Sequence, residues 1–411
     1  MIELKAKDES EGVDPQGHSR RDGSNLGAYF NIVCAVAGAG TLGMPHAFAQ
    51  GGWIAILLII ISGLLSWFAG KLLLECAYAH LPLRHDSYPA IGEAAFGAKG
   101  RIFIQVFHYA ILLGVSSLFV MLSGINLHLV SKGTSFELTT RQWTWISGFL
   151  ILIPYLCIKD MKEYVWLSIL GVMTTVFTVV IACVLGLIHL PELTSIQHEP
   201  VNWTLMPVAL STIGFSFGGS VIYPHVESGM RDPKQWSRVL FLALLTVSGL
   251  YLLMGSVGYY VYGKGVRSPI MESLPDILAN KIASIIITLH LILAAPLTLI
   301  AFSVELERIV GWGMTFRLAS RQVIMVLLTV NAAYMPSFGN FMALLGAISN
   351  LVVIFVAPVA CHLKLFGWRN RSTFTYLAMV GCILIGIVGG IIGGIEAFIR
   401  LITSGKHGLF E

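Results

Sequence analysis

The sequence predicts an all-α membrane protein with about eleven transmembrane helices. Of its 411 residues, 56% are hydrophobic and only 12% are charged, whereas about a quarter of the residues of a soluble domain are charged. The apolar runs are long and continuous, as helices of about 20 residues must be to cross hydrocarbon about 30 Å thick. They lack the alternation that is typical of a transmembrane β-barrel. The small net charge of +4 gives no sign of nucleic-acid binding.

The apolar runs divide the chain into a polar tail, one transmembrane domain and a short end. Residues 1–24 are rich in Asp, Glu, Ser and Gly, so we expect a disordered tail. Residues 25–404 form a single transmembrane domain, and residues 405–411 form a short tail. The predicted spans cover residues 27–48, 52–80, 101–130, 143–159, 163–190, 204–226, 237–262, 279–305, 319–336, 338–366 and 374–400.

The connections between the spans indicate how the chain is oriented. Most Lys and Arg residues fall in the N-terminal tail and in the connections on the same side of the membrane. Because cytoplasmic loops carry the excess of these residues, we expect a cytoplasmic N-terminus and a non-cytoplasmic C-terminal tail. The connection at residues 81–101 contains an amphipathic stretch that predicts a short helix or a structured loop. The six cysteines lie in apolar runs without a CxxC pair, so we expect buried thiols and no metal site.

Two spans are interrupted by residues that break helices. The first contains Gly38, Gly40, Gly43 and Pro45, and the sixth contains glycines and a proline within residues 214–224. A glycine destabilises a helix interior by about 1 kcal/mol and a proline by about 3 kcal/mol. Irregular backbone at membrane depth survives only where protein buries it or a cavity solvates it.

The positions of the two breaks predict a binding site for an amino acid. Spans 1 and 6 begin two sets of five, and transporters with inverted five-helix repeats break these corresponding helices. Half-helix N-termini attract anions, and freed carbonyls hold a cation or an ammonium group. We expect the substrate carboxylate at Gly38, Ala39, Gly40, Thr41, Leu42 and Gly43, and the ammonium at Phe215, Ser216, Phe217 and Gly218.

Other interpretations of these motifs remain open. Glycine-rich motifs in membrane helices often serve only close packing, and Phe215 and Phe217 either cover the substrate or pack between helices. The G-x-G-x-x-G pattern that begins at Gly38 also matches a dinucleotide-binding fingerprint. That interpretation fails because the motif lies in a membrane span, no βαβ unit surrounds it, and Pro45 follows two residues later.

Four ionisable residues are candidates for coupling and gating, because such residues inside spans are expensive and usually functional. His290 lies near the middle of span 8, where an imidazole either takes part in proton coupling or is a neutral group hydrogen-bonded to a neighbouring helix. His108 in span 3 is a weaker candidate of the same kind. His225 and Glu227 follow span 6, where they form an inner-gate ion-pair network or are ordinary solvated residues.

Three segments together resemble the amino acid/auxin permease family, which contains vacuolar, vesicular and sodium-coupled neutral amino acid transporters. These segments are residues 38–53 (GAGTLGMPHAFAQGGW), residues 215–219 (FSFGG) with 223–227 (YPHVE) and Met230, and residues 289–296 (LHLILAAP) with 305–308 (ELER). The resemblance covers nearly the whole chain. It implies a LeuT-type fold with a 5+5 inverted repeat, eleven spans, a cytoplasmic N-terminus and secondary active transport of amino acids.

The chain departs from the sodium-coupled members of this family at two positions. The resemblance implies an asparagine four residues before Gly38 and a threonine two residues before Pro296. Cys34 and Ala294 stand there instead, and neither offers a hard oxygen ligand. This departure favours proton coupling, although backbone carbonyls alone remain able to hold sodium.

We therefore predict a proton-coupled transporter for neutral amino acids in the vacuolar or lysosomal membrane or the plasma membrane, acting as a monomer in the bilayer without a cofactor. The substrate is assigned as neutral because the predicted pocket holds no central Lys, Arg or Asp. A sodium-coupled symporter is one alternative, and a membrane receptor that senses amino acids is another. An enzyme is not expected, because no span carries a Ser/His, paired Asp or HExxH constellation.

Overall fold

The computed structural model describes residues 23–80, 84–157, 164–189, 196–310, 314–369 and 371–408. These residues are mostly helical. The α-helices are α2 (Asn25–Val36), α3 (Ala39–Gly51), α4 (Ala55–Ala77), α5 (Tyr88–Ser131), α6 (Thr140–Cys157), α7 (Tyr164–His189), α8 (Met206–Ser216), α9 (Tyr223–Ser228), α10 (Trp236–Tyr262), α11 (Leu278–Val310), α12 (Met314–Tyr334), α13 (Phe338–Leu345), α14 (Ala357–Phe366), α15 (Thr373–Ile387) and α16 (Gly394–Gly408). Short 3₁₀ turns are η2 (Pro233–Gln235), η3 (Gly263–Gly265) and η4 (Ile270–Glu272), and π-helical turns are η5 (Gly346–Asn350), η6 (Val352–Val356) and η7 (Val388–Gly393).

Within the described residues, seven helices are long and apolar enough to cross a membrane, or eight when the bent pair α2–α3 is one span. The predicted spans at α6, α8–α9 and α12 do not meet this criterion of length and hydropathy. The chain is thus a multi-pass membrane protein, and the number eleven stays a prediction.

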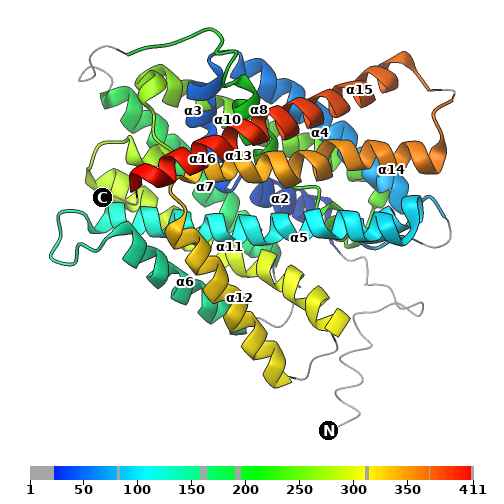
Figure 1. Cartoon of the computed structure of the whole chain (residues 1–411), viewed down its shortest axis with the longest axis horizontal. Helices are drawn as coiled ribbons and strands as arrows, with labels where there is room; N and C mark the ends of the chain where they lie inside the picture. Colours follow the sequence, from blue (N-terminus) through cyan, green and yellow to red (C-terminus); the bar gives the residue numbers. More distant parts are fainter. Residues whose placement is uncertain are drawn as a thin grey trace.

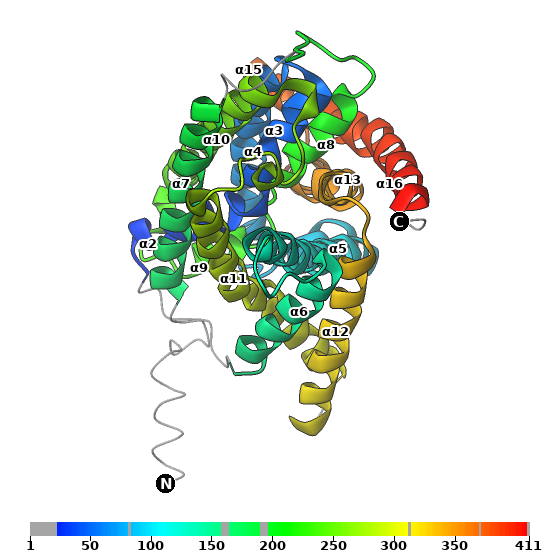
Figure 2. The same ribbon diagram turned by 90° about the vertical axis from the view of Figure 1, so that its left-hand side faces the viewer.

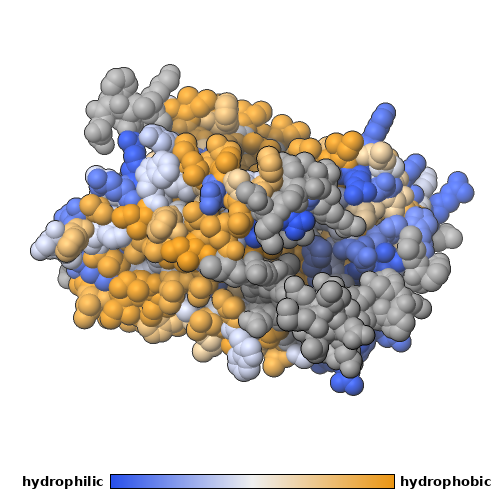
Figure 3. All heavy atoms as spheres, turned by 90° about the horizontal axis from the view of Figure 1, so that it is seen from below, coloured by the Kyte–Doolittle hydropathy of each residue, from blue (hydrophilic) through white to orange (hydrophobic). Residues whose placement is uncertain are grey.

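The long helices pack side by side in one bundle (Figure 1). Helix α5 runs along α11, and α3 packs between α8 and α10. Helices α6 and α12 lie together at one edge in both ribbon views (Figures 1 and 2). Apolar side chains cover the middle and left of the face in Figure 3, and hydrophilic ones gather toward the right end. An apolar surface of this kind is typical of a protein that lies in the hydrocarbon core of a membrane.

The two interrupted helices run through the bundle in opposite directions. Helix α3 ends beside the segment before α8, where the amide of Asn202 donates to the Gly51 carbonyl (2.9 Å). Helix α2 begins beside the segment after α9, where the Gly23 amide donates to the Gly229 carbonyl (2.9 Å) and the Arg231 amide donates to the Gly23 carbonyl (2.8 Å). We name the two ends of the bundle the His198 end, which holds the α3–α4 turn, and the Arg84 end, which holds the α4–α5 connection. An antiparallel pair of broken helices is what an inverted repeat requires.

The first part of α5, residues 88–96, is a short helix, one of the two structures that the sequence predicts for residues 81–101. Ser87 caps its N-terminus by accepting a hydrogen bond from the amide of Ala90 (3.3 Å). The helix ends at Gly97, whose φ of 67° lies in the left-handed region, where glycine is the default residue. The chain then turns into the long part of α5 that crosses the bundle.

Candidate functional site

The first break is narrower than the sequence predicts. Helices α2 and α3 meet at 48°, but only Ala37 and Gly38 lie outside a helix. Gly40, Gly43 and Pro45 are all within α3. The prediction that all four residues break the span is therefore wrong, and Gly38 alone of the four lies at the break.

The helical glycines of α3 serve close packing instead. A Cβ on Gly40 would lie 2.7 Å from the Cβ of Ser216 and 3.0 Å from its Cα. A Cβ on Gly43 would lie 2.2 Å from the terminal methyl carbon of Met342. Removing side-chain atoms at these points lets α3 approach α8 and α13, as small residues do in membrane helices. Ala39, Thr41 and Leu42 are buried in the same helix, and the Thr41 hydroxyl donates back to the Ala37 carbonyl (2.6 Å).

The second break is wider. Helix α8 ends at Ser216, and the chain stays irregular until α9 begins at Tyr223. Phe217 and Gly218 lie in this irregular stretch. Phe217 is fully buried, and its ring packs edge-on against Tyr251 with 5.4 Å between centroids. Phe215 belongs to a different apolar cluster, with Leu42 and Phe119, so the two phenylalanines pack against different parts of the bundle.

One tyrosine joins the two breaks. The hydroxyl of Tyr251 on α10 lies 2.6 Å from the carbonyl oxygen of Val36 and 2.6 Å from that of Ser216. These carbonyls belong to the last residues of α2 and α8. The carboxyl ends of both half-helices, far apart in sequence, therefore meet at one side chain.

A second group of predicted residues meets in a cavity of about 250 Å³. Cys34, His290 and Ala294 all line it, together with Ser168, Gly171 and Thr174 of α7. A Cβ on Gly171 would lie 2.4 Å from Cε1 of His290 and 2.6 Å from the sulfur of Cys34. The side chains of His290 and Cys34 therefore both lie against Gly171, in space that a larger residue at this position would fill. His290 is 7% exposed, and Cys34 lies in the last turn of α2.

Glu227 belongs to a buried network at the Arg84 end. Its carboxylate is 1% exposed, receives a hydrogen bond from the Tyr78 hydroxyl (2.5 Å), and forms an ion pair with Arg84 at 2.6 Å. Arg84 also donates to the Pro224 carbonyl at the start of α9 (2.7 Å). Burial tends to lower the pKa of Arg84, but the Glu227 carboxylate outweighs it and raises the pKa above its ordinary value. Arg84 therefore stays charged and clamps α9 to the α4–α5 connection.

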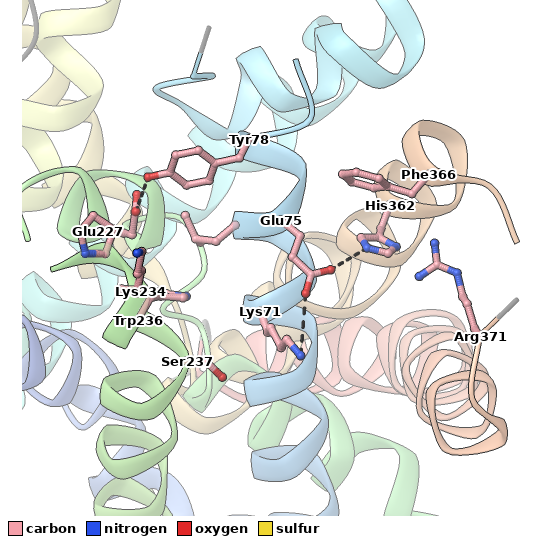
Figure 4. A pocket seen from close by; sticks show the side chains of 12 residues that line it. Lys71, Glu75, Tyr78, Glu227, Lys234, Trp236, Ser237, His362, Phe366 and Arg371 are labelled. Carbon is pink, nitrogen blue, oxygen red and sulfur yellow. Dashed lines mark hydrogen bonds and ion pairs between the residues drawn. The ribbon is translucent and has the colours of Figure 1, made fainter. Parts of the chain in front are cut away.

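The wall of an adjoining cavity of about 610 Å³ includes Tyr78 and Glu227. Figure 4 shows Tyr78 pointing to Glu227 on one side of this cavity and Glu75 pointing to His362 on the other. The Glu75 carboxylate lies 2.8 Å from Nε2 of His362 and 3.8 Å from the Lys71 ammonium. Polar groups from α4, α9 and α14 thus line this cavity at the Arg84 end of the bundle.

The remaining two predicted residues, His225 and His108, line neither of these two cavities. His225 is exposed on α9, two residues before Glu227. His108 is half-buried in α5, where its Nδ1 has no hydrogen-bond partner among the described residues. The two histidines interact electrostatically with each other, and neither lines the cavity that holds His290.

Three residues that organise these sites are not marked by any pattern in the sequence. Tyr251 is one of several aromatic residues in an apolar span, and Gly171 is one of 42 glycines. Arg84 lies in a connection where a cation is ordinary. No local pattern marks any of them, because each acts through partners from distant segments.

The sequence model of the transmembrane amino acid transporter protein family matches residues 21–399. The chain belongs to this family. It is 27% identical over 390 residues to the amino acid transporter AVT1B of Arabidopsis thaliana, covering 92% of this chain and 71% of that protein. It is 24% identical over 437 residues to the vesicular inhibitory amino acid transporter of Rattus norvegicus, covering 97% and 80%. It is therefore a membrane transporter of amino acids and not an enzyme.

Solved structures show the same fold. MhsT in complex with L-phenylalanine aligns with a TM-score of 0.55 at 14% identity, covering 93% of this chain and 98% of that one. A Na⁺-coupled sialic acid symporter aligns with a TM-score of 0.55 at 11% identity, covering 91% and 90%. At such low identity the likeness speaks only for the fold, which is the LeuT type with interrupted first and sixth spans.

Gly40→Val tests the contact between α3 and α8. The added side chain meets the backbone of Ser216, so we expect a loss of about 1–3 kcal/mol in the free energy of unfolding and a loss of amino acid uptake. The matched control is Gly249→Val on α10, because a Cβ on Gly249 meets nothing within 4 Å. Thermal unfolding and uptake are measured for both variants. Equal behaviour of the two would contradict the packing role.

Arg84→Gln tests the clamp on α9. It leaves the buried Glu227 carboxylate without its cation, which typically destabilises by about 3–5 kcal/mol. We expect a large fall in the unfolding temperature, with partial recovery in the double variant Arg84→Gln, Glu227→Gln. Lys264→Gln is the control, because its ion pair with Glu199 is more than a third exposed and such pairs contribute about 0–1 kcal/mol. A fall no larger than that of the control would show that the pair does not hold α9.

Proposed function

We propose that this protein couples the movement of protons to the transport of neutral amino acids. The observation that carries the proposal is the shared cavity of Cys34, His290 and Ala294 between α2, α7 and α11. Two of these residues stand where the family resemblance implies oxygen ligands for sodium. The third is a titratable imidazole that opens onto the same space.

The chemistry of this cavity suits a proton better than a sodium ion. A thiol and a methyl group are poor partners for a hard cation. The side-chain oxygens among the described residues that line the cavity are the neutral hydroxyls of Ser168 and Thr174, without a carboxylate. An imidazole binds and releases a proton reversibly, which a methyl group and a hydroxyl do not. His290 is therefore the group that we assign to proton binding.

The position of the cavity explains how a proton would act on transport. Cys34 lies two residues before the end of α2, where the helix dipole is negative. A cation at this point is favoured, typically by about 0.3–1 kcal/mol at exposed sites and more where partly buried. Protonation of His290 would then favour the position of α2 that lies closest to α11. Such a bias shifts the balance between two transporter states.

The substrate is proposed to bind at the two breaks. Its carboxylate faces the amino-terminal end of α3, where Ala39 and Gly40 begin the helix, and its ammonium faces the carbonyls of Val36 and Ser216. The residues of both breaks, 36–43 and 214–222, include no charged side chain. This composition supports neutral amino acids, since a charged side chain would need a partner in the low-dielectric interior.

Opening at the Arg84 end must separate contacts that now close it. The N-terminus of α2 is joined to the segment after α9 through the backbone of Gly23, and α9 is joined to the α4–α5 connection through Arg84 and Glu227. We assign Glu227 to the inner gate. Because the Lys and Arg distribution favours a cytoplasmic N-terminus, this gate faces the cytoplasm.

The membrane is proposed to be that of an acidic compartment, vacuolar, lysosomal or vesicular, with the plasma membrane as the alternative. The rat relative is named as a vesicular transporter. In each of these membranes the non-cytoplasmic side is the more acidic one, so a proton-coupled carrier would draw on the gradient across it.

Uptake into proteoliposomes tests the coupling ion and the substrate. A panel of amino acids is offered under a pH gradient or a sodium gradient, imposed separately. We expect neutral amino acids to accumulate under the pH gradient alone, with up to about tenfold accumulation per pH unit when one proton moves with each substrate. Accumulation that follows sodium and ignores pH would contradict proton coupling.

His290→Gln tests the proposed proton site. Glutamine keeps hydrogen-bonding capacity but does not titrate near neutral pH, so we expect equilibration without accumulation and a flat dependence of uptake on pH. His80→Gln is the control, because His80 is exposed near the end of α4. If His290→Gln keeps the pH profile of the unmodified protein, His290 is a structural residue.

A further inference from the structure

At the junction of the two half-helices, two partially negative helix ends lie close together. The last carbonyls of a helix lack intrahelical partners and carry partial negative charge. Val36 and Ser216 end α2 and α8, and both of their carbonyl oxygens lie within 2.6 Å of one hydroxyl. Two such ends repel each other unless a cation or a hydrogen-bond donor lies between them.

In transporters with interrupted helices, a coupling cation commonly occupies such a position, held by half-helix carboxyl ends and unwound carbonyls. In this protein the position is occupied by part of the chain itself. Tyr251 is fully buried, and its hydroxyl lies within hydrogen-bond distance of both carbonyls, with one proton to donate to either. We propose that Tyr251 takes the place of a bridging cation and makes the α2–α8 junction independent of sodium.

The surroundings of Tyr251 hold the hydroxyl in place before any substrate arrives. Its ring packs edge-on against the ring of Phe217, which is itself fully buried and belongs to the second break. Val36, Phe217 and Tyr251 lie in the same apolar cluster. A donor fixed in this way loses little freedom when the junction forms, whereas a free ion must be captured and desolvated.

The hydroxyl has a single proton, so it donates fully to only one of the two carbonyls at a time. The other carbonyl remains an acceptor for a second donor. The proposed substrate supplies one, because its ammonium group carries three N–H donors. Tyr251 and the substrate ammonium would thus complete the junction together, without a metal ion. This step rests on the proposed function, while the replacement of the cation does not depend on which ion drives transport.

Tyr251→Phe tests the inference. It removes the bridging hydroxyl and keeps the ring that packs on Phe217. The matched control is Tyr259→Phe on the same helix, because Tyr259 is also fully buried and its hydroxyl accepts a hydrogen bond from the amide of Glu199 (2.8 Å) at the His198 end. The purified full-length proteins are unfolded thermally in NaCl, KCl or choline chloride at equal ionic strength and constant pH.

We expect Tyr251→Phe to be stabilised specifically and saturably by NaCl, since the gap left by the hydroxyl exposes two carbonyls to a small cation. The unmodified protein and Tyr259→Phe should unfold at the same temperature in all three salts. In proteoliposomes under a pH gradient, uptake of the amino acid selected by the panel should fall at least tenfold for Tyr251→Phe in choline chloride and recover at least threefold in NaCl.

Other results would contradict the proposed role of Tyr251. Tyr251→Phe that unfolds at one temperature in every salt, or that transports at the unmodified rate in choline chloride, would overturn the inference. So would equal stabilisation of Tyr251→Phe, Tyr259→Phe and the unmodified protein by NaCl, because sodium would then act at a site that does not depend on the Tyr251 hydroxyl. If Tyr251→Phe is too unstable to transport, the salt dependence of its unfolding still decides. Failure of the pH gradient to drive the unmodified protein would contradict the proposed coupling and leave the role of Tyr251 standing.

Discussion

Backbone groups that are freed in the middle of a membrane need partners, and this constraint organises the rest of the structure. A break in a membrane helix survives only where the protein satisfies its carbonyls and amides. At the first break the Ala37 amide donates back to Val33 (2.8 Å), and at both breaks the terminal carbonyls meet the Tyr251 hydroxyl. For one side chain to reach both carbonyls, the carboxyl ends of α2 and α8 must both lie beside Tyr251 of α10.

Much of the fold was predictable from composition and periodicity. The long apolar runs, the paired interruptions and the short helix before the third span all depend on local sequence, and the structure contains each of them. The extent of the first break was not predictable in this way. Glycine permits both a break and a close approach of two helices, and only the position of Ser216 against Gly40 shows that packing decides there.

The residues of the candidate site were predictable, but their arrangement was not. His290, Cys34 and Ala294 could be selected one by one, from burial in a span or from a departure from a family pattern. That they share a cavity depends on Gly171, whose role follows from the approach of α7 to α2 and α11. Arg84 and Tyr251 likewise acquire their roles from other segments, because Glu227 lies 143 residues from Arg84, and Val36 and Ser216 lie 215 and 35 residues from Tyr251. Spacing along the chain does not encode such partners.

The three proposed elements of transport act on one short half-helix. Helix α2 has 12 residues, so it is about 18 Å long. Its N-terminus is tied to the segment after α9 through Gly23, its last turn carries Cys34 beside His290, and its final carbonyl belongs to the Tyr251 junction. A helix of this length moves as a rigid body, so a change of charge or contact at one end must be felt at the other. Proton binding and substrate binding at the break would thus reach the inner gate through the same element, with no need for a longer path through the bundle.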